Sequence, residues 1–234
     1  PEGARDYLVP SRVHPGQFYA LPQSPQQLKQ LLMVAGYERY FQIARCFRDE
    51  DLRADRQPEF TQLDMEMSFV ERDDILNLIE ELMVGMVKHT SLVPLAYEKF
   101  PRLSYGDVVD RYGTDRPDLR YGLELVNIGD IVANSAFRVF AENVAAGNPV
   151  KAICAPGCGD YSRKQMTELE DLARTAGAQG LAWLAIHPET EEVRGPIAKF
   201  FTVEQLIAIT ERMKAGPGDL ILISSDTKAV VHEV

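Results

Sequence analysis

The sequence contains few of the residues on which disulfide, metal and membrane architectures depend. It has three Cys, four His and one Trp among 234 residues, and no apolar run approaches the ~20 residues of a transmembrane helix. Three cysteines are too few, and odd in number, for a disulfide framework. Cys154 and Cys158 lie close together, but a structural zinc site needs four ligands and no third or fourth is near them. We therefore expect a cytoplasmic protein with no metal ligands and no membrane contact.

Basic residues are also scarce, because the formal net charge is −10. That sign excludes a protein that binds nucleic acid over its whole surface. Any RNA contact must be local. Residues 39–56 are the candidate, since they hold five arginines against four acidic residues, namely Arg39, Arg45, Arg48, Arg53 and Arg56 against Asp49, Glu50, Asp51 and Asp55. The chain starts at Pro1 without Met or a signal-peptide pattern, and we expect it to be a piece of a longer protein.

Two strands joined by a charged loop are predicted around this basic stretch, over residues 40–48 and 59–70. Side chains alternate between the two faces of a strand, so the pattern predicts one apolar and one polar face. The apolar face would hold Phe41, Ile43, Leu63, Met65, Met67 and Phe69. The polar face would hold Gln42, Arg48, Phe60, Gln62, Asp64 and Glu66. The loop is too long for a tight hairpin, and its arginines suit a grip on phosphate.

The remaining periodicities predict an α+β protein. In the first part, Ser24 is predicted to cap a helix with Pro25 at its first position and an apolar stripe of Leu28, Leu31, Leu32 and Ala35. Later helices are predicted from Asp73 or Asp74 to Thr90, from Ser104 to Tyr112, over 163–176 and over 203–213. Further strands are predicted at 18–21, 123–127, 150–153, 181–186 and 220–224. The turn-rich GTDRPDLRYG places a domain boundary near Tyr121, dividing residues 1–120 from 121–234.

A family resemblance rests on the hairpin and its loop. Phe47-Arg48-Asp49-Glu50, followed by Arg56, Phe60 and Asp64, resembles the second signature motif of class II aminoacyl-tRNA synthetases. The wording RDEDLRADRQPEFTQLD, with PEGARDYLVPSR and FYALPQSPQQLKQLLM, resembles the bacterial aspartyl type. The resemblance implies that residues 1–120 are part of an antiparallel-sheet catalytic domain. Residues 121–234 would be most of the α+β insertion domain, called GAD, that interrupts it.

The resemblance also implies roles for individual residues. The aspartate substrate would be bound by Glu2, Ser24, Gln26, Lys29, Arg48, Gln62 and Asp64. ATP would be bound by Arg48, Asp49, Glu50, Arg56, Gln57 and Phe60, with Arg48 as the catalytic residue on the α-phosphate. Arg53 would contact the tRNA acceptor end. From helical spacing alone, Lys29 lies off the apolar stripe and would be an ordinary exposed lysine, so its role depends on the resemblance.

The implied reaction forms aspartyl-adenylate from L-aspartate and ATP and transfers the aspartyl group to tRNA(Asp). In the intact enzyme the resemblance implies a homodimer and Mg²⁺, whose ligands would lie outside this chain. The isolated chain is expected to be inactive. Two alternatives remain. One is a lysyl- or asparaginyl-type relative, and its lysyl version is disfavoured because a lysine pocket would need an acidic residue where Lys29 stands. A truncated module that binds tRNA or protein without catalysis is the non-enzymatic alternative.

Overall fold

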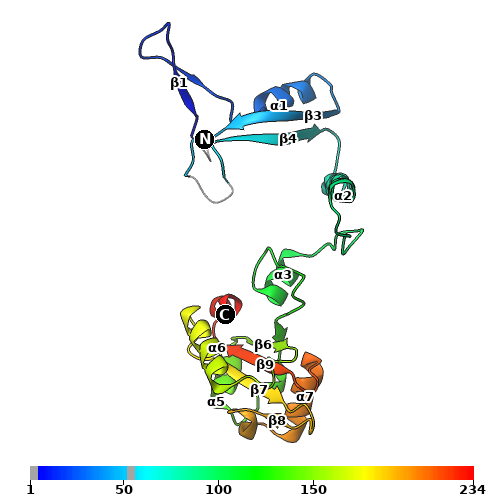
Figure 1. The fold of residues 1–234 in the computed structure, drawn as a ribbon, viewed down its shortest axis with the longest axis vertical. Coiled ribbons are helices and arrows are strands. Elements are labelled where there is room, and N and C mark those ends of the chain that lie inside the picture. Colours follow the sequence, from blue (N-terminus) through cyan, green and yellow to red (C-terminus); the bar gives the residue numbers. More distant parts are fainter. Residues whose placement is uncertain (1–4, 52–55) are drawn as a thin grey trace. The chain divides into compact units, whose positions relative to one another are not determined.

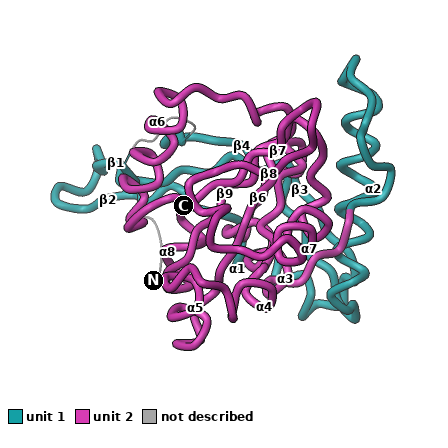
Figure 2. Tube along the Cα trace, turned by 90° about the horizontal axis from the view of Figure 1, so that it is seen from below, with its two compact units in different colours: residues 1–100 teal, residues 101–234 magenta. Residues whose placement is uncertain are grey.

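The computed structural model describes residues 5–51 and 56–234, which form two compact units, 1–100 and 101–234 (Figures 1 and 2). In the described part, no helix is long and apolar enough to span a membrane. The expected mixture of helices and antiparallel sheets is confirmed. The expected catalytic and insertion domains, 1–120 and 121–234, stay predictions. The compact units divide about 20 residues earlier, because Lys151 of the second unit bonds Asp110 and Arg111 pairs with Glu124.

The first unit is built on two hairpins and two helices (Figure 1). Strands β1 (Leu8–Pro10) and β2 (Phe18–Ala20) pair antiparallel, as do β3 (Arg39–Phe47) and β4 (Glu59–Met67). Helix α1 (Gln26–Val34) contacts both β3 and β4, and α2 (Arg72–Thr90) follows β4. The two predicted strands of the central hairpin are therefore confirmed, with ends shifted by one to three residues.

Helix α1 corrects two predictions from the sequence. Its N-cap is Pro25, with no side-chain cap among the described residues, so the predicted Ser24 cap is wrong. The predicted apolar stripe does not define its buried face either, because Leu28 and Leu31 are 67% and 63% exposed. Lys29 is the buried residue of the helix, at 7% exposure. Ion pairs of Lys29, described below, turn the helix toward the polar face of the hairpin.

The faces of the β3–β4 hairpin are divided as the alternation predicts, but their burial is the reverse of a usual sheet. The register pairs Gln42 with Asp64 and Ala44 with Gln62, which places these polar residues on one face. That face carries the buried Ala44 and Cys46, whereas Phe41 and Ile43 on the apolar face are each 73% exposed. Helix α1 and its lysine therefore pack on the polar side of the hairpin, where the site residues were predicted.

The second unit is a five-stranded antiparallel sheet in the order β5-β6-β9-β7-β8 with helices on both faces. Its core joins alternate β9 residues such as Ile221 and Ile223 to Phe140 and Ile209, while Leu220 packs against Met166 on the other side. The strands are β5 (Val126–Asn127), β6 (Val150–Ala155), β7 (Ala182–Ile186), β8 (Val193–Arg194) and β9 (Leu220–Ser225). The helices are α3 (Tyr105–Tyr112), α4 (Gly129–Val132), α5 (Arg138–Ala145), α6 (Arg163–Thr175), η1 (Ala198–Phe200), α7 (Val203–Met213) and α8 (Lys228–Glu233).

The predicted helix starts in this unit are confirmed where the sequence has an N-cap residue. Ser104 accepts from the Asp107 N–H and begins α3, and Thr202 forms a capping box with Gln205 at the start of α7. Residues 131–146 contain the end of α4 and the whole of α5. Strand β8 and helix α8 were not predicted, since two strand residues and a six-residue helix give too short a period to detect.

Candidate nucleotide and amino-acid site

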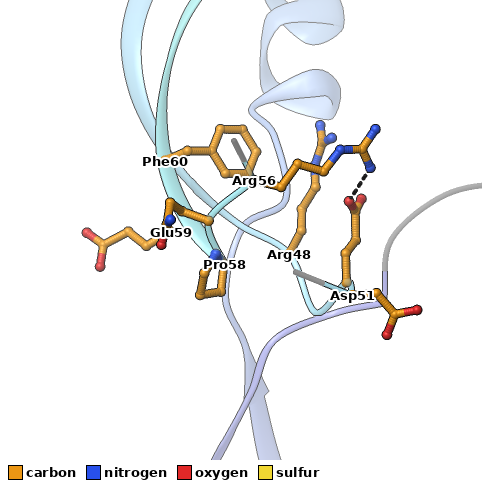
Figure 3. Close-up of a pocket in the computed structure, with 8 residues that line it drawn as sticks. Arg48, Asp51, Arg56, Pro58, Glu59 and Phe60 are labelled. Carbon is orange, nitrogen blue, oxygen red and sulfur yellow. Dashed lines mark hydrogen bonds and ion pairs between the residues drawn. The ribbon is translucent and has the colours of Figure 1, made fainter. Parts of the chain in front are cut away.

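Two groups of residues on the β3–β4 hairpin make the candidate site. The first surrounds a cavity of about 350 Å³ at the loop end of the hairpin (Figure 3). It is lined by five of the six residues expected to bind ATP, and by three that sequence reasoning did not assign. These are Arg48, Glu50, Arg56, Gln57 and Phe60, together with Asp51, Pro58 and Glu59. The sixth expected residue, Asp49, is exposed and pairs through its backbone with Arg5.

Backbone hydrogen bonds fix the residues that line this cavity at the ends of β3 and β4. Phe60 lies on β4 opposite Cys46 of β3, and the Arg48 N–H donates to the Pro58 carbonyl at 2.9 Å. The Asp49 N–H donates to the Arg5 carbonyl at 3.0 Å, which ties the segment after β3 to the N-terminal strand region. Backbone contacts therefore fix where the side chains of Arg48 and Phe60 begin.

Two cationic side chains face this cavity, and each already has a partner. The Arg48 guanidinium carbon lies 5.0 Å from the centre of the Phe60 ring, within cation–π range. Arg56 Nη1 lies 2.9 Å from Glu50 Oε2, and Figure 3 shows both guanidinium groups extending to the same side of the cavity. An aromatic face next to two planar donors can bind a ring and phosphates together. A nucleotide would replace the Arg48–Phe60 contact by stacking.

The second group is centred on Lys29 of α1. Its Nζ lies 2.9 Å from Asp64 Oδ1 and 3.2 Å from Glu66 Oε2, both on the polar face of β4. Burial alone lowers the pKa of Lys29, but hydrogen bonds to the two carboxylates outweigh it, so the pKa is raised. Lys29 is therefore a fixed, charged ammonium in a buried place. Such a group can hold a carboxylate and reject a neutral amide.

Neighbouring polar groups complete this second cluster. Asp64 Oδ2 is buried and has no hydrogen-bond partner within residues 5–51 and 56–234. The Cys46 Sγ donates to Gln62 Oε1 at 3.2 Å, and burial raises the pKa of this thiol. Gln62 lies two residues before Asp64 on the same face of β4, and Ser24 is half-buried near the start of α1.

Not every expected residue joins the two clusters. Gln26, which the resemblance implies is an aspartate-binding residue like Lys29, is exposed. Glu2 and Arg53 lie outside the described residues. Glu66 was missed as a partner of Lys29, although strand alternation places it two residues beyond Asp64 on the same face. That spacing could have identified it.

This fold and site define a class of protein. Residues 1–222 match the family profile described as tRNA synthetases class II (D, K and N), and the chain belongs to that family. The predicted resemblance is confirmed.

Individual members of the family are more than half identical to this chain. It is 60% identical over 97% of its length to the aspartate–tRNA(Asp/Asn) ligase of Moorella thermoacetica. It is 59% identical over 99% of its length to the aspartate–tRNA ligase of Geobacillus kaustophilus. The aspartate–tRNA(Asp/Asn) ligase of Dehalococcoides mccartyi is 55% identical over the whole chain. The chain spans 38% to 40% of the length of these relatives.

Proposed function

We propose that this chain supplies the amino-acid and ATP pockets of an aspartate–tRNA ligase. An oxygen of the L-aspartate α-carboxylate would attack the α-phosphorus of ATP, releasing pyrophosphate and leaving aspartyl-adenylate. A terminal ribose hydroxyl of tRNA(Asp) would then attack the activated carbonyl and release AMP. The observation that carries the proposal is the cavity whose lining includes five of the six expected ATP residues.

Positioning and charge neutralisation are what such phosphoryl chemistry requires of a protein. Phe60 would stack on the adenine, Arg48 would hold the α-phosphate, and Arg56 would leave Glu50 for the terminal phosphates. Gln57 lines the same cavity. Asp49, also expected to bind ATP, is exposed at the end of β3. These residues would bind and orient ATP, and Glu50 forms an ion pair with Arg56.

Aspartate recognition would be the task of the Lys29 cluster. Lys29, Asp64 and Glu66 together carry one positive and two negative charges, so a further carboxylate needs a second cation. In this proposal Arg48 is that cation, and it contacts both the aspartate and the phosphate. Gln62 and Asp64 would line the amino-acid pocket, with Glu2, Ser24 and Gln26 as expected further contacts. Arg53 would reach the tRNA acceptor end.

The remaining attributes of the parent enzyme are proposed from the family alone: a cytoplasmic homodimer that uses Mg²⁺. The described residues contain no group of three or more His, Cys, Asp or Glu that could hold a metal. No step above depends on a metal.

The test is aspartate-dependent pyrophosphate exchange in the full-length protein that contains this chain. Lys29→Met should lower kcat/KM for aspartate by at least ~100-fold, or roughly 2.7 kcal/mol, and reduce the preference over asparagine. Lys99→Met is the matched control, since Lys99 is exposed in the same unit. The ratio of the two amino acids does not depend on the fraction of folded enzyme. An unchanged ratio in Lys29→Met would refute the assigned role.

A further inference from the structure

A second cavity, unrelated to the hairpin site, lies within the second unit. Its volume is about 340 Å³, and it is bounded by the start of α5, the Gln179–Ala182 segment before β7 and the end of β9. Its position is set by unequal strand lengths. Pairing between β7 and β9 ends at Ala182 and Ile223, while β9 continues to Ser225. The end of β9 therefore extends past β7 and forms part of the cavity wall.

The body of the cavity is apolar and aromatic. The Phe137 and Phe140 rings meet edge to face, with centroids 4.7 Å apart and planes at 83°. Ile197 and Ile223, both nearly buried, also line it. An apolar cavity of about 150 Å³ binds benzene in a well-studied protein. This larger cavity has room for a six-membered ring with a short side chain.

The end of β9 and the residue after it bring two polar side chains to the cavity lining. Ser225 Oγ is buried and has no hydrogen-bond partner in the part of the chain that the structure describes. A buried hydroxyl without a partner costs about 1–3 kcal/mol, so such a group is uncommon without a role. Asp226 follows it directly and is half-buried. Of the described residues that line the cavity, Asp226 alone is charged.

We propose that this cavity binds a small organic cation, with an ammonium or amidinium group on a ring-sized apolar body. The body would contact Phe137 and Phe140, and the nitrogen would donate to the Asp226 carboxylate and to Ser225 Oγ. A single carboxylate at the end of an apolar pocket favours a cation and disfavours an anion of the same shape. The site is independent of the proposed ligase function, because all its lining residues belong to the second unit.

The experiment uses two probes of matched shape and opposite charge on the ¹⁵N-labelled 234-residue protein. Phenethylamine should cause saturable shifts of the amide resonances of Gly180, Ser225 and Asp226. 3-Phenylpropionate should bind at least ~5-fold more weakly. Equal affinity for both probes, or no saturable shift at these amides, would overturn the proposal.

Two variants and a control locate the binding. Asp226→Asn should weaken phenethylamine binding at least ~5-fold. Ser225→Ala should weaken it at least ~2-fold, and this variant keeps the strand if Asp226→Asn unfolds. The control is Asp171→Asn on α6, a 66% exposed carboxylate that pairs with Arg174 away from the cavity. If the Asp171 control weakens binding as much as the cavity variants, the assignment of the site is wrong.

Discussion

Lys29 Nζ and Asp64 Oδ1 lie 2.9 Å apart and join helix α1 to strand β4 through an ion pair whose side chains are 9% and 12% exposed. Removing one partner of a buried pair leaves the other charge without compensation, which is more costly than removing both. Loss of Lys29 would destabilise the unit further, because Glu66 Oε2 also pairs with Lys29 Nζ at 3.2 Å. The Lys29 ammonium therefore stabilises the packing of α1 on β4, in addition to its proposed role in the aspartate pocket.

We predict that Lys29→Met lowers the stability of the first unit by about 2–4 kcal/mol. Amide hydrogen exchange along β3 and β4 would measure it, since the two strands form one antiparallel pair. Adding Asp64→Asn and Glu66→Gln to Lys29→Met should restore part of the loss, because the uncompensated charges are then removed. Exchange rates in Lys29→Met equal to those of the unmodified protein would show that the pair contributes nothing.

The aromatic ring of the first cavity gives a second prediction. In the full-length protein, Phe60→Leu should raise KM for ATP by about 5- to 100-fold, since stacking of a base on an aromatic ring is worth ~1–3 kcal/mol. KM for aspartate should change little. The comparison variant is Phe41→Leu. Phe41 lies on the opposite face of the hairpin and is 73% exposed. Similar KM values for ATP in the two variants would contradict the stacking role.

Local sequence rules identified the hairpin, the division of its residues between two faces, and the polar face that holds the proposed site residues. Those rules work because alternation has a period of two and depends on the backbone alone. They failed for α1, where periodicity indicated that Leu28 and Leu31 would be buried and Lys29 exposed. The structure shows the reverse, because two carboxylates on β4 bind Lys29 and no helical periodicity encodes a partner 35 residues away. The family resemblance assigned Lys29 to the aspartate pocket, and that role stays a prediction.

The cavity in the second unit could not be predicted from the sequence, for a different reason. Its wall is made by segments far apart in the sequence, from Phe137 to Asp226, and by the end of β9 running past β7. Strand ends are the least certain part of any sequence-based assignment. Ser225 and Asp226 look like ordinary residues at the end of a strand, so their shared position was not predictable from the sequence.

Catalysis by the isolated chain provides a third prediction. The 234-residue protein should show no aspartate-dependent pyrophosphate exchange above background, because it spans only 38% to 40% of the length of its relatives. The full-length protein is the positive control. Exchange by the short chain within ~100-fold of the full-length rate would show that the pockets described here suffice.

Two glycines with similar backbone conformations allow a matched test of the packing of α8. Gly113 has φ +73°, and a Cβ there would collide with the His232 carbonyl oxygen. Gly122 has φ +64°, but a Cβ there would meet no described atom within 4 Å. Gly122→Ala should therefore cost about 1–2 kcal/mol from the left-handed conformation alone. Gly113→Ala should cost at least ~1 kcal/mol more, because α3 and α8 must move apart.

Trp183 makes this comparison measurable. It is the one tryptophan in the sequence and lies on β7, so its fluorescence during urea unfolding reports on the second unit. Equal destabilisation by the two glycine variants would contradict the close contact between Gly113 and His232.

His232 on α8 leads to the last prediction, which concerns pH. Burial lowers the pKa of His232, and the positive charges of Lys151 and Lys228 lower it further, while Asp110 acts in the opposite direction. Its Nε2 is buried without a hydrogen-bond partner among the residues that the structure describes. Because the folded protein resists protonation at this site, the unfolded chain binds the proton first as the pH falls below about 6.5.

Stability of the second unit should therefore fall as the pH goes from 7.5 to 5.5, by up to about 1.4 kcal/mol at pH 5.5. His232→Gln should remove this pH dependence while leaving the stability near pH 7.5 close to that of the unmodified protein. Asp110 does not interfere in this window. The hydrogen bond from Lys151 lowers the pKa of Asp110 below its usual 3.8, so its contribution is lost only in stronger acid. Urea unfolding followed by Trp183 fluorescence at pH 7.5, 6.5 and 5.5 is the measurement, and equal slopes for the two proteins would show that another group controls the acid response.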